Sequence, residues 1–313
     1  MKKKIYSVFV LTSIFILILN IFLKTEVLTK SIIFSSNLFI KNIMPSLFPM
    51  FVISGILVSI GMPEFLGSIF NRLFNKIFKT KGEISFIFFM SMITGFPSSA
   101  KYIKDLINKK LINEQDANKA LMFTFFSNPL FIINTVGLLF YKDIIIGIYI
   151  LICHIISNII TGILFRNYNK NYDIKIISKK EAIYKFYKKI NTTNFFNLLL
   201  NSIKNSIEAL INIFGVVTFS IILINIFFTP DNLLKIGLIG LLEMTTGLKY
   251  ISSLDLSLNL KVILSGFLIS FGGFSVHMQI MSILKEKKIK YLPFLISRII
   301  SCLITSILLY MLF

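Results

Sequence analysis

Long apolar runs that contain almost no charged residues constrain this chain more than any other feature. An α-helix needs about 20 residues to cross a bilayer core of about 30 Å. Runs that reach this length, or nearly so, lie at residues 5–23, 42–60, 144–165, 209–228, 260–284 and 291–313. With 55% apolar residues and a mean hydropathy of +0.82, the composition excludes a soluble protein. The sequence therefore predicts an all-α polytopic membrane protein whose main partner is the lipid bilayer.

The net charge of +19 comes from Lys and Arg residues that lie between the apolar runs. In this position they orient a membrane protein, so we expect no nucleic-acid partner. Lys2, Lys3 and Lys4 precede the first run, which is longer than the apolar part of a signal peptide and has no small-residue cleavage site. We therefore expect a first span with a cytoplasmic N-terminus. Cys153 and Cys302 both fall inside spans, which gives no support for a disulfide or a metal site.

Two shorter apolar runs, Ile84–Thr94 and Leu233–Leu242, are about half the length of a span. Each ends in a run of glycine and short polar residues, and we interpret both as re-entrant hairpins. Two spans contain similar interruptions, Ser127-Asn128-Pro129 within 120–140 and Gly272-Gly273-Phe274-Ser275 within 260–284. These predict broken transmembrane helices. Residues 63–78 have the helical spacing of an amphipathic helix at the membrane interface.

The two halves of the chain repeat this order. A shift of 148 residues aligns Lys101-Tyr102-Ile103 with Lys249-Tyr250-Ile251 and Phe126-Ser127 with Phe274-Ser275, without a gap. The span count then places the two hairpins on opposite sides of the membrane. Of the 33 Lys and Arg residues, Lys101, Lys249 and Arg298 lie at membrane depth and most of the others are cytoplasmic; the segments assigned to the outer side hold only Lys24, Lys30, Lys41, Lys142, Lys235 and Lys261. This agrees with the positive-inside rule and predicts inverted repeats.

We therefore divide the chain into four parts. They are an N-terminal transmembrane helix (1–30), a first repeat (31–165), a basic cytoplasmic loop (166–192) and a second, inverted repeat (193–313).

Four motifs in this order give the chain its resemblance to a known family. They are Gly95-Phe96-Pro97-Ser98-Ser99-Ala100-Lys101, Phe126-Ser127-Asn128-Pro129-Leu130-Phe131-Ile132, Gly240-Leu241-Leu242-Glu243-Met244-Thr245, and Gly273-Phe274-Ser275-Val276 followed by Pro293-Phe294-Leu295-Ile296-Ser297-Arg298. With these motifs the chain resembles, over nearly its whole length, the YlbJ-type sporulation integral membrane proteins of the nucleoside-recognition (Gate) domain superfamily. The resemblance implies a fold akin to that of concentrative nucleoside transporters. It also implies a role in moving dipicolinic acid (dipicolinate) from the mother cell across the outer forespore membrane. Phe96 and Phe126 stand where smaller or polar residues are expected.

Lys101 and Lys249 are related by the repeat and follow the two hairpin tips, where they could hold a dianionic solute between them. Both could instead extend to the membrane interface. Glu243 is an ionisable group at membrane depth that could bind a coupling ion, pair with Lys101, Lys249 or Arg298, or contact a solute donor. Contact with a solute donor would suit a nucleoside better than a dicarboxylate.

Short groups at the breaks complete the predicted solute site: Ser98, Ser99, Ser127, Asn128, Thr245, Thr246, Gly273 and Ser275. Each polar one could equally cap a helix or bond across the bundle. We interpret His154 and His277 as satisfied core histidines, and Arg298 as a packing anchor paired with a carbonyl or with Glu243.

The sequence thus predicts a membrane transporter of a small polar or anionic solute, without a cofactor. A nucleoside transporter and a non-transporting spore-envelope protein remain as alternatives. The two histidines are dispersed and show no His/Asp or Cys/His catalytic spacing, which argues against an enzyme. A coupling ion and homo-oligomerisation are left open.

Overall fold

The computed structural model describes residues 2–168, 179–192 and 194–313, and in these parts the chain forms helices and no strand. Six of the described helical segments are long and apolar enough to cross a membrane: Tyr6–Leu23, Thr25–Ser59, Ile144–Leu164, Phe195–Phe227, Leu258–Ile283 and Tyr291–Leu312. Many of their large apolar side chains are exposed, as expected for surfaces that face lipid. The predicted all-α polytopic membrane protein is confirmed.

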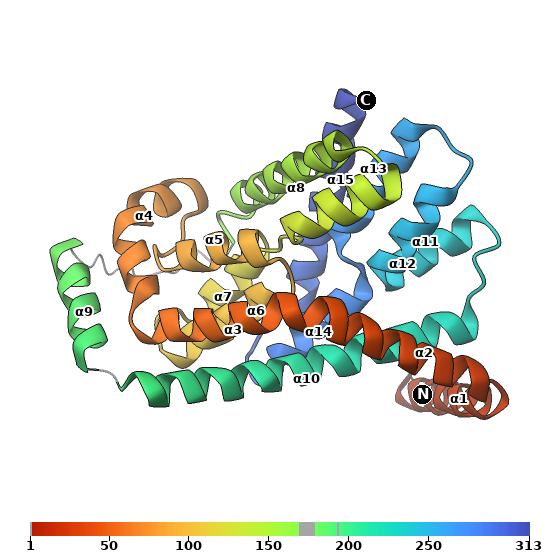
Figure 1. The fold of residues 1–313 in the computed structure, drawn as a ribbon, viewed down its shortest axis with the longest axis horizontal. Coiled ribbons are helices and arrows are strands. Elements are labelled where there is room, and N and C mark those ends of the chain that lie inside the picture. The colour runs from red at the N-terminus through yellow and green to blue at the C-terminus, as the bar shows by residue number, and fades with distance from the viewer. Residues whose placement is uncertain (1, 169–178, 193) are drawn as a thin grey trace.

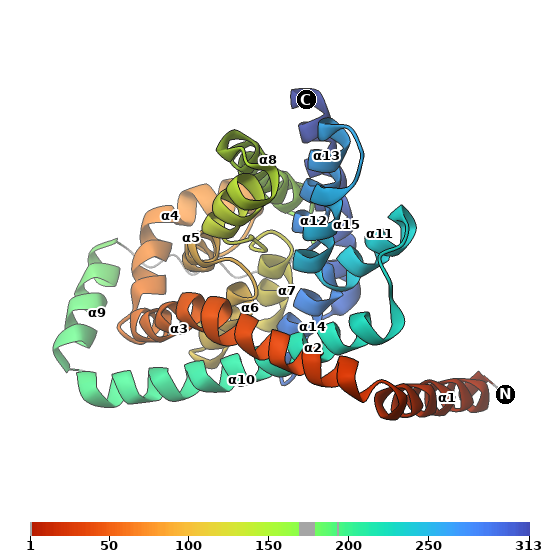
Figure 2. The same cartoon turned by 45° about the vertical axis from the view of Figure 1, so that its right-hand side comes forward.

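Helix α1 (Lys2–Leu23) stands apart from the rest of the molecule (Figures 1 and 2). Helix α2 (Thr25–Leu38), a π-helical turn at Phe39–Ile43 and α3 (Met44–Ser59) then form one helical run. This run lies along α10 (Phe195–Phe227) in both views. The predicted span at 42–60 is therefore too short. Its helix begins at Thr25, because small residues such as Ser31 and Ser35 let the polar segment pack closely on α10.

Helix α4 (Met62–Phe78) confirms the helix predicted at 63–78. It packs against α9 (Lys179–Thr192), where the Phe65 and Phe186 rings stack and Lys189 donates to Glu64 at 2.7 Å. Helix α9 lies in the region predicted as a basic loop, so the described end of that loop is helical. Residues 169–178 of the predicted loop lie outside the described residues.

The rest of the first half contains α5 (Ile84–Thr94), α6 (Ser98–Asn108), α7 (Glu114–Leu121), a π-helix at Phe131–Tyr141 and α8 (Ile144–Leu164). The bounds of α5 are those of the predicted short run. The span predicted at 120–140 is wrong in its first part, because residues 124–128 have no regular structure. The backbone of this segment is bonded instead by the His154 side chain, at the Ser127 amide, and by the Phe96 amide, at the Phe126 carbonyl.

The C-terminal part contains α11 (Leu233–Leu242), α12 (Met244–Ser253), α13 (Leu258–Phe271), α14 (Gly273–Ile283) and α15 (Tyr291–Leu312). Helix α11 has the predicted bounds, and α13 and α14 are separated at Gly272 as the motif predicts. The span predicted at 209–228 is too short, because its helix, α10, begins at Phe195. Aromatic rings form much of the core, with Phe78 stacked on Phe123 at 4.4 Å.

Candidate functional site

The first helix break lies between α5 and α6. Gly95 has φ +77°, and a Cβ atom at this position would lie 2.4 Å from the backbone nitrogen of Asn128. The Phe96 amide donates to the Phe126 carbonyl at 2.6 Å, and the Asn128 side chain donates to the Thr94 carbonyl at 3.3 Å. The α5–α6 loop is therefore held directly against the non-helical segment 124–128.

The second break, between α11 and α12, has the same relation to a later break. A Cβ atom on Gly273 would lie 3.0 Å from the backbone nitrogen of Met244, so the α13–α14 junction abuts the α11–α12 junction. Helices α11 and α12 approach closely at Gly240 and Gly247, where a Cβ on Gly247 would meet the Gly240 Cα at 2.2 Å. In each half, then, a pair of short helices places its junction against the break in a later helix.

The two break regions meet at Phe125. A Cβ on Gly272, whose φ is +85°, would lie 2.4 Å from this ring. Phe96 stacks on Phe125 at a centroid distance of 4.6 Å, and the Arg298 guanidinium carbon lies 4.7 Å from the ring centroid. The contact between the two regions is thus built around one buried aromatic ring.

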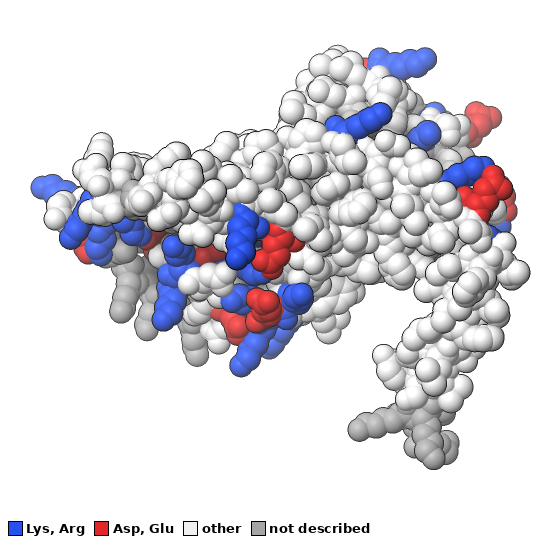
Figure 3. Space-filling model, turned by 60° about the horizontal axis from the view of Figure 1, so that its bottom comes forward, with Lys and Arg blue, Asp and Glu red and all other residues white. Residues whose placement is uncertain are grey.

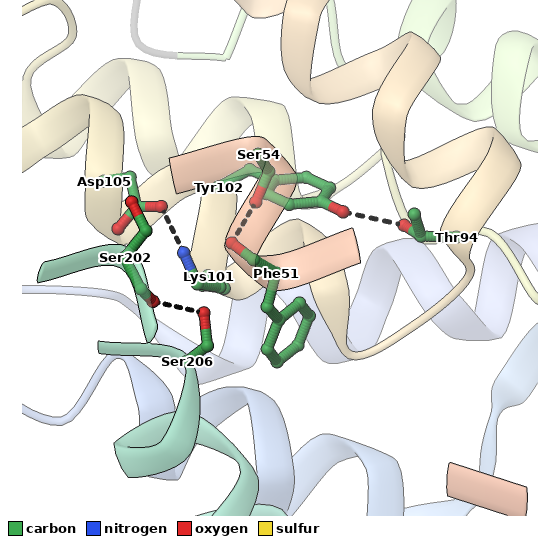
Figure 4. Close-up of polar contacts among 8 residues, drawn as sticks. All are labelled: Phe51, Ser54, Thr94, Lys101, Tyr102, Asp105, Ser202 and Ser206. Atoms are coloured by element: carbon green, nitrogen blue, oxygen red, sulfur yellow. Dashed lines mark hydrogen bonds and ion pairs between the residues drawn. The ribbon is translucent and has the colours of Figure 1, made fainter. Parts of the chain in front are cut away.

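Lys101 lies one turn into α6 and is only 3% exposed. Its Nζ forms an ion pair with Asp105 Oδ2 at 2.6 Å and lies 5.7 Å from the centroid of the Phe51 ring (Figure 4). The next residue, Tyr102, donates its hydroxyl hydrogen to Thr94 at 3.1 Å, which fixes α6 on the end of α5. Ser202 and Ser206 of α10 lie near Lys101 in the same view. A buried ammonium needs such a partner, because moving an unpaired charge out of water into the protein costs on the order of several kcal/mol.

A polar groove adjoins this ion pair. It consists of two adjoining cavities, one of about 550 Å³ between α3, α6 and α10 and one of about 260 Å³ between α6, α10 and the end of α14. Both are lined by Lys101, Asp105, Asn108 and Asn205. Asn197, Asn201 and Asn205 recur every fourth residue on α10 and line the larger cavity or both. Figure 3 shows acidic and basic side chains next to one another on the face along which α10 runs, whereas most of that surface is uncharged. The groove therefore offers amide donors and acceptors beside one nearly buried cation.

A segment in the first half of the molecule is similar to a known protein family. Residues 40–143 match the family model described as nucleoside recognition (Gate). This stretch is similar to a Gate domain. It is also 28% identical to the sporulation integral membrane protein YlbJ of Bacillus subtilis (strain 168) over 288 residues, which cover 82% of this chain and 71% of that protein. No solved structure matches the chain. The predicted resemblance is confirmed.

The Gate domain brings together the predicted residues of the first half. Ser98 and Ser99 begin α6 and are fully buried, and Ser127 and Asn128 lie across the loop from them. The Ser99 hydroxyl has no hydrogen-bond partner among the described residues. Lys101 lies on the same helix, three residues after Ser98 and two after Ser99.

The predicted residues of the second half lie outside the Gate match. Glu243 accepts from the backbone amides of Thr245 at 3.1 Å and Thr246 at 2.7 Å, so its carboxylate caps α12. It forms no ion pair among the described residues. Ser275 accepts from Gln279 at 3.3 Å, and Gly273 forms the junction with α11–α12. Lys249 is exposed, unlike its repeat partner Lys101, so the structure does not bring the two lysines into one site.

The predicted pairing of Arg298 with a carbonyl and the predicted hydrogen-bonded His154 are confirmed, and the structure joins the two side chains in one buried network. Arg298 donates to the Met122 carbonyl and to the Asn158 side chain, the latter at 3.0 Å, and His154 Nε2 accepts from the Ser127 amide at 3.0 Å. The network supplies the backbone of the Gate segment 122–127 with partners that a helix would have provided. The signal that could have revealed it is the pair of polar residues, His154 and Asn158, one turn apart on an otherwise apolar span.

The described residues hold no group of three or more His, Cys, Asp or Glu side chains that could bind a metal ion. Cys153 and Cys302 are free and buried. The chemistry that the described site can perform is binding, through one cation, several amides and hydroxyls, and backbone groups at helix junctions.

Proposed function

We propose that this chain transports a small polar solute across the membrane, and that the solute passes the two break regions. The observation that carries the proposal is the contact of each short helix pair with a later helix break, next to the polar groove. Irregular backbone at membrane depth is tolerated only where it is buried in protein or lines a cavity, and solute sites in secondary transporters lie at such discontinuous helices.

In this proposal the two halves are inverted repeats with re-entrant hairpins. The 148-residue shift relates Gly95 to Glu243 and Phe125 to Gly273. The α5–α6 junction contacts segment 124–128, and in the same way the α11–α12 junction contacts the α13–α14 junction. The solute site would draw on the residues predicted at these junctions, which are Ser98, Ser99, Lys101, Ser127, Asn128, Glu243, Thr245, Thr246, Lys249, Gly273 and Ser275.

Dipicolinate is the solute we propose, moved across the outer forespore membrane during sporulation. Two observations support an anion of this kind. The similar protein from Bacillus subtilis is a sporulation membrane protein, and Lys101 offers a nearly buried cation at the groove. Glu243 does not argue against a dicarboxylate, because both of its oxygens already accept backbone hydrogen bonds and require no solute donor.

A nucleoside is the second candidate, because the matched family model is described as nucleoside recognition and the asparagine amides of the groove can both donate and accept. A non-transporting protein of the spore envelope is the third. An enzyme is not proposed, since neither family comparison points to a reaction.

Uptake into proteoliposomes that contain the purified protein distinguishes these functions. We expect pyridine-2,6-dicarboxylate to enter protein-containing vesicles faster than protein-free vesicles, and uridine to enter both at the same rate. Faster entry of uridine alone would favour the nucleoside function. Entry of neither solute, in a preparation shown to be folded by its cooperative thermal unfolding, would overturn the transporter proposal.

A further inference from the structure

The charges that line the polar groove are balanced. Three cations, Lys101, Lys104 and Lys109, face three acids, Asp105, Glu208 and Glu286. Lys104 lies 3.7 Å from Glu208 and 3.9 Å from Glu286, and both acids are about 60% exposed, so these contacts are weak and open to water. A carboxylate entering the groove thus meets no net positive charge. To bind, it must replace an acid that is already present.

Asp105 is the acid whose replacement would matter most. It is the ion-pair partner of Lys101, and it lines both cavities with a side chain that is 17% exposed. The Lys101 side chain is 4% exposed, so Asp105 is the more accessible partner of the ion pair. Apart from Asp105, the residues that the structure places beside Lys101 include Phe51, whose ring centroid lies 5.7 Å from Nζ, and Ser202, which lines the larger cavity with it (Figure 4). None of these carries a negative charge.

We propose that a solute carboxylate binds in the polar groove by taking the place of Asp105 on Lys101, and that Asp105 takes up a proton in the same event. This inference rests on the proposed function. The solute would then be a carboxylate that enters the groove together with one proton. The hydrogen bond and ion pair from Lys101 Nζ to Asp105 Oδ2 are broken, one from Nζ to the solute carboxylate is formed, and a proton from water in the groove attaches to Asp105. The net charge of the groove is unchanged, which avoids leaving two anions beside one buried cation.

The asparagine stripe on α10 provides the remaining contacts. The side-chain amides of Asn197, Asn201 and Asn205 make no hydrogen bond to other described residues, and they line the groove beside Lys101. Amide groups can donate to a second carboxylate or to a ring nitrogen without adding charge. The larger cavity, at about 550 Å³, is within the range of small-molecule sites.

Other titratable groups around α6 have partners elsewhere. Helices α3 and α5 contribute no charged residue. On α7, Asp116 pairs with Lys81, Glu114 accepts from the Lys288 amide, and Lys119 donates to the carbonyls of Lys79 and Arg166. On α14, His277 contacts the Tyr291 hydroxyl and the Phe271 carbonyl. Asp105 is therefore the group of this cluster whose charge is most directly tied to occupation of Lys101.

Equilibrium binding of pyridine-2,6-dicarboxylate to the purified full chain tests the exchange. If one proton enters with the ligand, the dissociation constant rises with pH, by up to about tenfold per pH unit. We expect Asp105→Asn to bind without this pH dependence, and at least as tightly as the wild type at neutral pH, because Lys101 is no longer paired. Asp105→Glu keeps the carboxylate and should keep the pH dependence. Lys101→Met should bind about tenfold more weakly or worse, since it loses a charge-assisted contact.

Glu208→Gln is the matched control, because Glu208 also lines the groove and faces a lysine but does not touch Lys101. It should keep the wild-type pH dependence. The inference is wrong if Asp105→Asn retains the pH dependence, if it binds as weakly as Lys101→Met, or if wild-type binding does not change with pH. If uptake is observed, each of these results contradicts the exchange at Lys101 but not the proposed transport. If binding depends on pH as expected but no uptake is observed, only the proposed transport is contradicted.

Discussion

Arg298 is a guanidinium enclosed entirely by protein, and no carboxylate among the described residues pairs with it. Its hydrogen bonds run to the Met122 carbonyl, Asn158 and Ser297, and its guanidinium carbon lies near the Phe125 and Phe294 rings. This arrangement anchors the non-helical Gate segment to α8 and α15. Arg298 therefore stabilises the fold by supplying donors where the helix is interrupted.

Asn158→Leu should destabilise the protein, because it leaves one donor of the buried Arg298 unpaired. Hydrogen bonds to charged groups are worth about 1.5–3 kcal/mol. The measurement is Tm in detergent. Ser157→Ala, one position earlier, removes a neutral contact to Ser301 and should cost only about 0.5–1.5 kcal/mol. Equal losses for the two variants would contradict a role for Asn158 in holding the cation.

Glu243→Gln should lower Tm by the equivalent of about 1 kcal/mol, because the carboxylate caps α12 and favours its N-terminal dipole. The pH profile of solute uptake should stay as in the wild type, since this carboxylate is held by two backbone amides. A variant that transports but loses its pH dependence would instead identify Glu243 as the proton-binding group.

The positions of the junction residues could be predicted from the sequence, but the different burial of residues related by the repeat could not. Lys101 and Lys249 occupy equivalent sequence positions, yet one is enclosed by α3 and α10 and the other is exposed on α12. The difference comes from helices far away in the chain, which no local pattern records. The ion pair with Asp105, four residues along the same helix, was within reach of a spacing argument.

Pairs of short helices give this fold its particular shape, and close glycine contacts hold one of them together. Helices α11 and α12 touch at Gly240 and Gly247, with the Leu268 side chain beside both. This packing places the Glu243 cap against Gly273. The geometry of the second break thus depends on two residues without side chains.

Gly247→Ala should disturb this helix pair, because the added Cβ would lie 2.2 Å from the Gly240 Cα. Overpacking of this kind typically costs about 1–3 kcal/mol. The matched control is Gly237→Ala on α11, where a Cβ meets nothing within 4 Å. Size-exclusion profiles and Tm in detergent should show a loss for Gly247→Ala alone. An unchanged Tm for both would mean that the close contact is not needed.

Element bounds were predictable where local signals are strong and failed where distant contacts decide. Helices α5 and α11 were predicted to the residue, because apolar runs end there at glycine, proline or a capping residue. The helical run from Thr25 and the continuous α10 were not, since their polar segments are helical through packing on each other. Segment 124–128 was not predicted as fully non-helical, because its partners lie later in the chain: His154, which bonds the Ser127 amide, and Arg298, which lies over the Phe125 ring.

At the scale of the whole molecule, the lysine-rich loop between α14 and α15 lies against α7, which follows Lys109 and Lys110. The α14–α15 loop is bonded to the start of α7: the Asn118 side chain donates to the Lys288 carbonyl at 3.2 Å and accepts from the Lys290 amide at 2.7 Å. Two loops from different halves therefore lie on one side. The positive-inside rule predicts that this side is cytoplasmic.

Labelling of single cysteines with a membrane-impermeant maleimide on intact cells tests this sidedness. Cysteines replacing the exposed Lys142 and Asp231 should react from outside, and those replacing Lys109 and Lys288 only after the membrane is opened. Cys153 and Cys302 are buried and provide little background. Reaction of all four positions from the same side would contradict the inverted arrangement.

Blocking the polar groove shows whether a solute passes beside Lys101, which is what the proposed transport requires. A cysteine at Asn201, which lines the larger cavity, is labelled with a bulky maleimide before uptake of pyridine-2,6-dicarboxylate is measured. A cysteine at the exposed Lys180 of α9, which does not line the groove, is labelled as the control. We predict that unlabelled Asn201→Cys still transports, more weakly than the wild type because one of the three asparagine contacts is lost, that the label stops its transport, and that labelled Lys180→Cys transports as before. Undiminished uptake by fully labelled Asn201→Cys would contradict passage through the groove.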